Sequence, residues 1–279
     1  VKAVPSLRSV EYAPAELLSG HLWLLELIDG RPLRFQLRES GLLRIGDDKR
    51  VYTDPDAVPL PLRRAVGHIR ATLDRTALRA AVDDVTAVTF FGVATTRESV
   101  PYALDSMPPF LGTDVWADAD KAFRPPDAAA GIFQRLGLVA VNTFERETHA
   151  RDFAVDRYEI PASAWYDGPA AGVVIRNKQG HRARISNPAV SEPTTQTATP
   201  GSEPEQSIDA LVAAYVSSER IDTIAASVDA DDGAVAVDTL ADELCATIGR
   251  RHPAAFLGAD TLDRSALRSA VAERVHQLR

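Results

Sequence analysis

Arginine side chains are the most numerous groups in this sequence that could bind phosphate. Only four of the 31 basic residues are lysines, so most of the positive charge is carried by guanidinium groups. A guanidinium offers paired N–H donors that match phosphate oxygens. A solvated face on which these arginines pair with the many acids explains them equally well. Seven of them fall on or beside predicted strands: Arg34, Arg38, Arg44, Arg50, Arg176, Arg182 and Arg184.

Residues that could act as nucleophiles or metal ligands are few. Cys245 is the only cysteine, and we expect it to be a packed, inert thiol. No two of the six histidines have a metal-ligand spacing such as His-x-x-x-His, so we predict no metal site from histidine or cysteine. The lysines that lie near predicted strands and turns are Lys49 and Lys178.

The composition predicts a globular, acidic protein. The chain has 279 residues, 45% of them hydrophobic, and a net charge of −8, which is enough for one large domain and a smaller one. Many Asp and few Lys residues suit a cytoplasm with high salt, and an acidic chain can attract nucleic acid only through a local group of arginines. No apolar run is long enough to span a membrane and no secretory signal is visible, so we expect a cytoplasmic protein without membrane contact.

Short apolar runs with turn signals predict the elements that must position these groups. Residues 22–28 and 33–37 read as a β-hairpin around Asp29-Gly30, with a third strand near 42–45. Apolar spacing predicts a helix or helix pair over 60–82 and a helix over 127–136 after Pro125-Pro126. Further strands are expected at 87–93, 110–116, 171–176 and 182–185, the last two joined by a turn at 178–180.

The C-terminal part reads as a separate helical module. Residues 189–206 lack the apolar side chains of a core and are predicted to be a linker between residues 1–188 and 207–279. Helical periodicity covers 207–217, 237–250 and 263–278, with Ser207, Asp238 and Asp263 as N-cap candidates. Strands interrupted by helices in the first part indicate an α+β domain of antiparallel sheets.

Five short segments carry carboxylates, glycines or arginines at fixed intervals. They are Glu-Leu-Ile-Asp-Gly at 26–30, Phe-Phe-Gly-Val at 90–93, Phe-Leu-Gly-Thr-Asp-Val at 110–115, Ala-Gly-Val-Val-Ile-Arg at 171–176 and Arg-Ala-Arg at 182–184. In this order and approximate spacing they resemble the motifs of the ATP-dependent RNA ligase family, which are covalent nucleotidyltransferases. The similarity covers residues 5–188. It implies an α+β nucleotidyltransferase domain of the RNA/DNA ligase adenylation type, which is ATP-grasp-like, followed by the small helical module.

The resemblance implies positions for the catalytic groups, and most of them hold other residues here. In the family, the first-motif lysine attacks the α-phosphorus of ATP and forms a lysyl-adenylate, and that place is Leu27. Val93 stands where a glutamate binds ribose, Ala171 where a glutamate helps to hold the metal, and Thr113 where an aromatic ring stacks on adenine. Arg182 and Arg184 replace the two lysines that neutralise the triphosphate.

The resemblance also implies ATP and magnesium as cofactors and RNA as a partner. The residues expected beside the nucleotide are Glu26, Asp29, Gly30, Arg50, Thr113 and Val173, with Lys49 as an alternative to Arg50. Because Val93 and Ala171 replace both motif glutamates, binding of magnesium should be weakened. Tryptophan and tyrosine rings at 23, 116, 165 and 166 could stack on bases, although core packing is their more common role.

Three hypotheses follow. The first is a catalytically inactive RNA-ligase-like protein that binds RNA or a partner through the retained cleft, because leucine has no lone pair for nucleophilic attack. The second is an active ATP-dependent RNA ligase that uses Lys49 or Lys178. The third is a structural or assembly protein whose C-terminal helices bind a protein partner. Natural loss and deliberate substitution of the catalytic positions would produce the same pattern.

Overall fold

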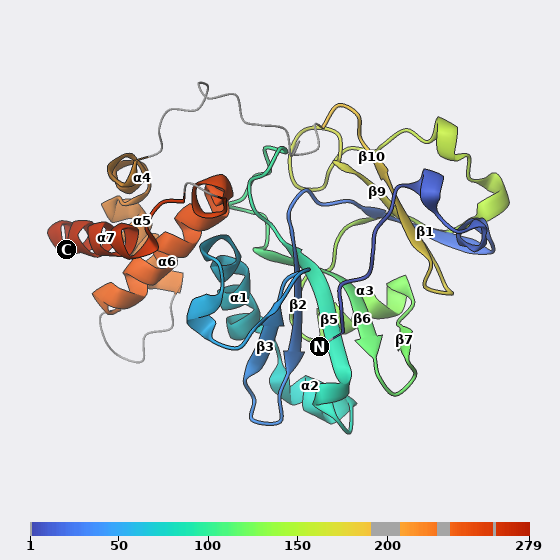
Figure 1. Cartoon of the computed structure of the whole chain (residues 1–279), viewed down its shortest axis with the longest axis horizontal. Coiled ribbons are helices and arrows are strands. Elements are labelled where there is room, and N and C mark those ends of the chain that lie inside the picture. The colour runs from blue at the N-terminus through green and yellow to red at the C-terminus, as the bar shows by residue number, and fades with distance from the viewer. Residues whose placement is uncertain (1, 191–206, 228–234, 259–260) are drawn as a thin grey trace. The chain divides into compact units, whose positions relative to one another are not determined.

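The computed structural model describes residues 2–190, 207–227, 235–258 and 261–279 (Figure 1). The described residues fall into two compact units, one within Val1–Ala57 and Ala65–Pro193 and the other within Val58–Arg64 and Thr194–Arg279. Residues 191–206, which make up most of the predicted linker, lie outside the described residues.

A four-stranded antiparallel sheet forms one half of the first unit. Its strands follow the order β10-β9-β1-β8, with β1 at His21–Glu26, β8 at Thr143–His149, β9 at Gly172–Asn177 and β10 at Arg182–Ser186. β1 is central, and its side chains from Leu22 to Glu26 are all buried. The predicted strands near 171–176 and 182–185 are therefore confirmed, whereas the polar edge strand β8 was not predicted.

A six-stranded antiparallel sheet forms the other half of this unit. Its order is β4-β3-β2-β5-β6-β7. The strands are β2 at Arg31–Leu37, β3 at Leu43–Gly46, β4 at Val51–Tyr52, β5 at Val88–Ala94, β6 at Phe110–Ala117 and β7 at Ala122–Phe123. The long strands match the predicted ranges, whereas the two-residue strands β4 and β7 were not predicted.

The predicted hairpin at Asp29-Gly30 is wrong. β1 pairs with β8 and β9, whereas β2 pairs with β3 and β5, so the Asp-Gly turn carries the chain from one sheet to the other. The Asp29 carboxylate accepts hydrogen bonds from the backbone N–H groups of Ser99 (2.7 Å) and Val100 (2.9 Å). The turn is held by this distant loop rather than by a ladder between its two flanking strands.

Three helices follow β4 and β7 in the chain, and one of them, α3, packs against β6 of the six-stranded sheet. α1 (Leu60–Thr72) and α2 (Arg75–Ala81) form the predicted pair, and α3 (Pro126–Arg135) begins one residue before the predicted helix. Phe133 of α3 reaches a group of aromatic rings on the strands, with its ring centroid 5.9 Å from that of Phe90. Phe35 stacks on Phe90 at 4.8 Å. These rings, all fully buried, hold the helix on the sheet.

Short 3-10 helices occupy the connections. They are Val10–Tyr12, Ala15–Leu18, Pro55–Ala57, Val85–Ala87, Ala150–Asp152, Val155–Arg157 and Pro253–Phe256.

The second unit is helical. It contains α4 (Ile208–Tyr215), α5 (Ser218–Ser227), α6 (Val237–Arg251) and α7 (Arg264–Leu278), of which α5 was not predicted. Its core includes Leu240, Leu244, Ile248, Leu267, Val271 and Val275, all fully buried. Ser207 and Asp263 accept N-cap hydrogen bonds as predicted, at 3.2 Å and 2.7 Å.

The predicted N-cap at Asp238 is wrong. Ala236 holds the cap position of α6, and the Asp238 carboxylate instead pairs with Arg268 at 2.9 Å. The carboxylate contacts α7 because the two helices pack against each other. Within the described ranges, no helix has the length and apolar character needed to cross a membrane.

Candidate functional site

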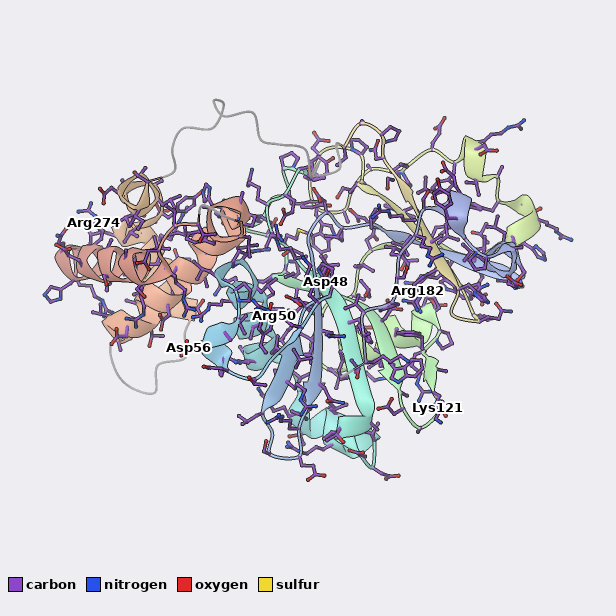
Figure 2. All side chains as sticks on the ribbon, viewed as in Figure 1. Asp48, Arg50, Asp56, Lys121, Arg182 and Arg274 are labelled. Carbon is purple, nitrogen blue, oxygen red and sulfur yellow. The ribbon has the colours of Figure 1, made fainter. Side chains whose placement is uncertain are left out.

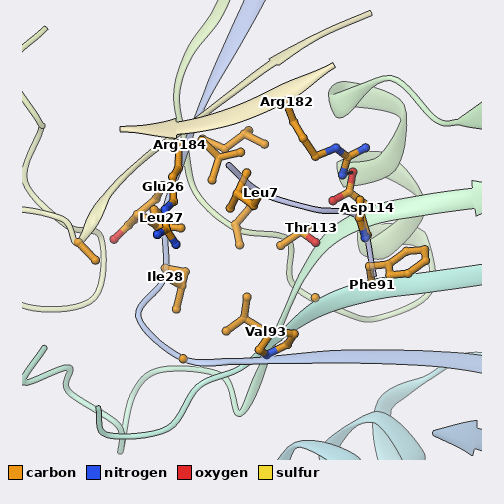
Figure 3. A pocket seen from close by; sticks show the side chains of 18 of the residues that line it. Leu7, Glu26, Leu27, Ile28, Phe91, Val93, Thr113, Asp114, Arg182 and Arg184 are labelled. Carbon is orange, nitrogen blue, oxygen red and sulfur yellow. Dashed lines mark ion pairs between the residues drawn. The ribbon is translucent and has the colours of Figure 1, made fainter. Parts of the chain in front are cut away.

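A cavity of about 580 Å³ lies between the two sheets of the first unit (Figure 3). Its walls come from β1, β9 and β10 on one side and from β5 and β6 on the other. Most of the lining side chains are apolar, while three arginines and four carboxylates supply the charge. A cavity of this size and lining is typical of small-molecule sites.

Most of the site residues expected from the sequence meet in this cavity. Those that line it are Glu26, Leu27, Asp29, Gly30, Val93, Thr113, Ala171, Arg182 and Arg184. Val173 does not line it, because its side chain is buried in a core cluster with Leu22 and Leu24. Its neighbour Val174 faces the cavity instead. Arg50 does not line it either: it lies before β4, apart from Arg182 (Figure 2), with its guanidinium 5.1 Å from the Tyr52 ring centroid.

Leu27 faces the cavity just beyond the end of β1 (Figure 3). Its backbone N–H donates a hydrogen bond of 3.0 Å to the carbonyl of Gly172. A Cβ atom on Gly172 would lie 2.9 Å from the Leu27 side chain, so the glycine leaves the space that this side chain fills. The position where the resemblance expects an amine therefore presents a hydrocarbon to the cavity.

The two acids that flank Leu27 are engaged within the protein. Glu26 is buried and accepts hydrogen bonds from the Ser163 hydroxyl (2.5 Å) and the Ala164 N–H (3.2 Å). Burial raises the pKa of Glu26 above its ordinary value, and these hydrogen bonds oppose the rise only in part. Asp29 holds the loop at residues 99–100, as described above. Both carboxylates serve internal contacts.

A buried trio of charges forms the floor of the cavity between β6, β9 and β10. The Asp114 carboxylate lies 2.7 Å from a guanidinium nitrogen of Arg176 and 2.8 Å from one of Arg182. The Asp114 and Arg176 side chains are 8% and 1% exposed. Burial lowers the pKa of Arg176 to about 10, so it stays charged at neutral pH. Arg176 also donates to the carbonyls of Thr113 and Arg124, at 3.1 Å and 3.3 Å.

Residues 2–9 form a segment, here called the N-terminal strap, that was not expected at the site. At one end the Lys2 ammonium lies 3.8 Å from the Trp116 ring centroid, and the Lys2 carbonyl accepts a 2.8 Å hydrogen bond from Arg34. At the other end the Arg8 carbonyl accepts from the N–H of Arg184 at 2.8 Å. The strap therefore joins the six-stranded sheet to the four-stranded sheet.

The strap places a leucine in the cavity. Residues 4–7 line it, and Figure 3 shows the Leu7 side chain projecting between Leu27 and Thr113. The alternation of Leu7 and Arg8 is compatible with an extended segment that has one apolar face, but two residues are too short a signal to predict it from sequence.

Two of the candidate base-stacking rings belong to the core. Trp23 and Trp116 are 1% and 9% exposed, and their indole N–H groups donate to Asp127 at 2.8 Å and Asp118 at 2.6 Å. Trp165 and Tyr166 are partly buried against a cluster that includes Val100 and Met107. Core packing, the alternative stated for these rings, accounts for Trp23 and Trp116.

The lining of the cavity supplies few uncommitted carboxylates for the magnesium that the resemblance implies. Of its four carboxylates, Glu26 and Asp29 bind the protein's own backbone and Asp114 neutralises arginines, so only Asp48 remains to be accounted for. No group of three or more His, Cys, Asp or Glu residues suited to a metal occurs in the described part of the chain. Magnesium is usually held by one or two carboxylates together with water and substrate phosphates, so Asp48 is the candidate protein ligand on this wall.

The chain matches no protein-family model and no curated protein. Solved structures do resemble it. A mutant of the Naegleria gruberi RNA ligase with ATP and Mn is 12% identical with a TM-score of 0.51, and the match covers 68% of this chain and 57% of that one. The Naegleria gruberi RNA ligase with PPi is 12% identical with a TM-score of 0.50, over 68% of this chain and 56% of that one.

An archaeal ATP-dependent RNA ligase is 12% identical, with a TM-score of 0.47, over 100% of this chain and 64% of that one. The chain thus spans between 56% and 64% of the length of these three structures. At such low identity the likeness to the Naegleria gruberi structures shows the fold alone. The predicted fold class is confirmed: the chain has the α+β nucleotidyltransferase fold of RNA ligases.

Proposed function

We propose that this chain is an RNA-ligase-like protein that forms no lysyl-adenylate and acts by binding RNA. One observation carries the proposal: Leu27 lines the cavity, and none of the four lysines, all of which lie in described parts of the chain, lines it. A covalent adenylate requires an amine with a free lone pair held in line with the α-phosphorus. The cavity offers no such lysine.

The two lysines considered as replacement nucleophiles have other surroundings. The Lys178 ammonium pairs with Glu147 at 3.3 Å and lies 5.2 Å from the Trp23 ring centroid. Lys49 belongs to the turn between β3 and β4, where its N–H donates to Asp47 at 2.8 Å. A reacting group must approach to about 3–3.5 Å, and errors near 1 Å already cost much of the rate. These placements support the inactive protein over an active ligase.

The first experiment tests for the covalent intermediate. Wild-type protein is incubated with α-labelled ATP and magnesium or manganese over a range of pH and salt, and the denatured protein is then checked for label. We expect none. A stable protein–AMP band would end the proposal, and mass spectrometry that located the adenylate on Lys49 or Lys178 would establish the active ligase.

A variant with the family's side chains restored tests whether their replacement prevents formation of the lysyl-adenylate. The triple variant L27K/V93E/A171E returns the amine and both carboxylates to the cavity wall. We expect label on position 27 of this variant and none on the matched double variant V93E/A171E. Label on the double variant would show that another residue can take the adenylate, contrary to the proposal.

The RNA-binding part of the proposal has its own test. A labelled single-stranded RNA is titrated with protein at several salt concentrations and followed by fluorescence anisotropy. We expect binding that weakens as salt rises, because phosphate contacts release counterions. Failure to bind RNA at low salt would overturn this part and favour the structural role, in which the C-terminal helices bind a protein partner.

A further inference from the structure

The N-terminal strap borders a second hollow in the first unit, which shares Pro5, Ser6 and Arg182 with the cavity between the sheets. It has a volume of about 590 Å³, and we call it the strap groove. The side chains that matter for its chemistry are Arg8, Tyr12, Phe123, His181 and Arg182. They come from the strap, the 3-10 helix that follows it, β7, the turn between β9 and β10, and the first residue of β10.

Pro5 and Ser6 of the strap line both hollows, and the next two residues separate them. Leu7 lines the cavity between the sheets and does not line the strap groove, whereas Arg8 lines the groove and not the cavity. An extended backbone explains the different placement of Leu7 and Arg8, because neighbouring side chains then point to opposite faces. The Arg8 carbonyl accepts a hydrogen bond from the Arg184 N–H of β10, so the backbone that carries the Arg8 side chain is held in place.

The charge of the strap groove is opposite to that of the whole chain. Two arginines and a histidine line it, and none of the described residues on its wall is acidic. The cavity between the sheets, by contrast, has four carboxylates on its wall, and the chain as a whole carries 39 acidic against 31 basic residues. A local group of basic side chains is what an acidic protein needs in order to bind a polyanion.

The strap groove also holds an aromatic ring that the fold does not use. Tyr12 is 72% exposed, the highest value among the large hydrophobic side chains of the described residues. The Phe123 ring, in contrast, is covered by the Arg182 guanidinium at 4.3 Å from its centroid. An exposed ring beside cations is the usual platform for an unpaired base of a single strand.

We propose that the strap groove binds single-stranded RNA, with its phosphates against Arg8 and His181 and a base stacked on Tyr12. Arg182 shapes the groove, because its guanidinium is already held by Asp114 at 2.8 Å and by Phe123. This inference rests on the proposed RNA-binding function and assigns it a surface. It predicts that the RNA lies outside the cavity that would hold a nucleotide in an active ligase.

The test compares the wild-type chain with Tyr12→Ala and Arg8→Ala in anisotropy titrations with a fluorescein-labelled oligouridylate. Loss of one stacking platform should weaken binding about five- to 150-fold. Arg8→Ala should weaken binding and reduce the slope of log K against log salt by about 0.7, the value for one phosphate contact on a single strand. Both side chains are exposed, so near-native circular dichroism is expected.

Two matched controls lie outside the strap groove. Leu42→Ala removes another exposed apolar side chain (65% exposed), and Arg151→Ala removes another exposed arginine, whose side chain is 76% exposed. Both should bind RNA like the wild type. Equal weakening by the controls, or binding of duplex RNA as tight as of single strands, would overturn the groove assignment.

The outcomes also separate this inference from the function on which it rests. If the wild type binds RNA and the Tyr12 and Arg8 variants bind it equally well, the strap groove is not the site, and the proposed RNA-binding function stands. If the wild type binds no RNA at low salt, the proposed function fails, and the groove assignment fails with it.

Discussion

The buried trio of Asp114, Arg176 and Arg182 gives the sharpest stability prediction. Asp114→Asn keeps the shape of the side chain and removes its charge, leaving two guanidiniums without their shared anion. Both ion-pair distances are short, at 2.7 Å and 2.8 Å, and the Asp114 side chain is 8% exposed. Breaking a buried pair in this way costs about 3–5 kcal/mol, so we expect the free energy of unfolding to fall by that amount at pH 7.

The pH dependence of this effect has a definite sign. Burial alone would raise the pKa of Asp114, but the two guanidiniums outweigh it and hold the pKa below its ordinary value. The stability that Asp114 contributes is therefore fully present above the unfolded pKa of about 4 and is lost as the pH falls through the lower folded value. The difference between wild type and Asp114→Asn should shrink below about pH 4.

Urea unfolding followed by tryptophan fluorescence measures this loss. All three tryptophans, at positions 23, 116 and 165, belong to the first unit, so the signal reports that unit alone. The control is Asp120→Asn, because the Asp120–Arg124 pair has a similar distance of 2.8 Å but side chains that are 52% and 43% exposed. An exposed pair contributes at most about 1 kcal/mol.

The comparison can refute the reasoning directly. If Asp114→Asn loses no more stability at pH 7 than Asp120→Asn does, the two arginines are not left as uncompensated buried charges. The assignment of the trio as a structural unit would then be wrong.

Two further changes can be read by the same unfolding measurement. Burial raises the pKa of Glu26, so the folded state binds the Glu26 proton more tightly than the unfolded state does. The free energy of unfolding of the wild type should therefore fall as the pH rises through that raised pKa, and Glu26→Gln should lack this fall. Superimposable pH profiles of the two proteins would contradict the prediction. In Gly92→Ala, the new Cβ would lie 2.3 Å from the Leu111 carbonyl oxygen and from the Phe110 ring, which should cost about 1–3 kcal/mol. Gly131→Ala, with nothing within 4 Å in α3, should cost nothing and is its control; equal losses would exclude the steric explanation.

Helices whose apolar side chains recur at helical spacing could be predicted from the sequence. The residues of α1, α2, α6 and α7 repeat apolar side chains at helical spacing, and the packed faces follow that spacing. β8 was missed for the opposite reason. Its sequence, Thr-Phe-Glu-Arg-Glu-Thr-His, lies on a sheet edge with no buried side chain, so it lacks the apolar alternation that marks a strand.

The pairing of strands was beyond local sequence signals. An Asp-Gly pair between two apolar runs is the usual mark of a hairpin, yet here β1 and β2 enter different sheets. The deciding contacts join the Asp29 carboxylate to backbone groups about 70 residues away, at positions 99 and 100. A turn motif carries no information about such a distant partner.

Most of the motif positions line the cavity, but the motifs did not indicate which charged side chains of the wall pair with each other. Arg176 was one of several arginines near the cleft, and only the fold brings it to Asp114, on another sheet. Leu7 came from a segment with no recognisable motif. These contacts depend on how the two sheets pack, which the periodicity of single strands does not encode.

The N-terminal strap is fastened unequally at its two ends. At Arg8 and Ser9 it is attached to β10 by backbone pairing, whereas at Lys2 one side-chain bond from Arg34 and an exposed ammonium over Trp116 hold it. Segments with few buried contacts open at the lowest free energy. Local opening of the strap should therefore start at Lys2, with Arg8 as the fixed point. Water would then enter the space between the sheets first from the side of β2 and β6.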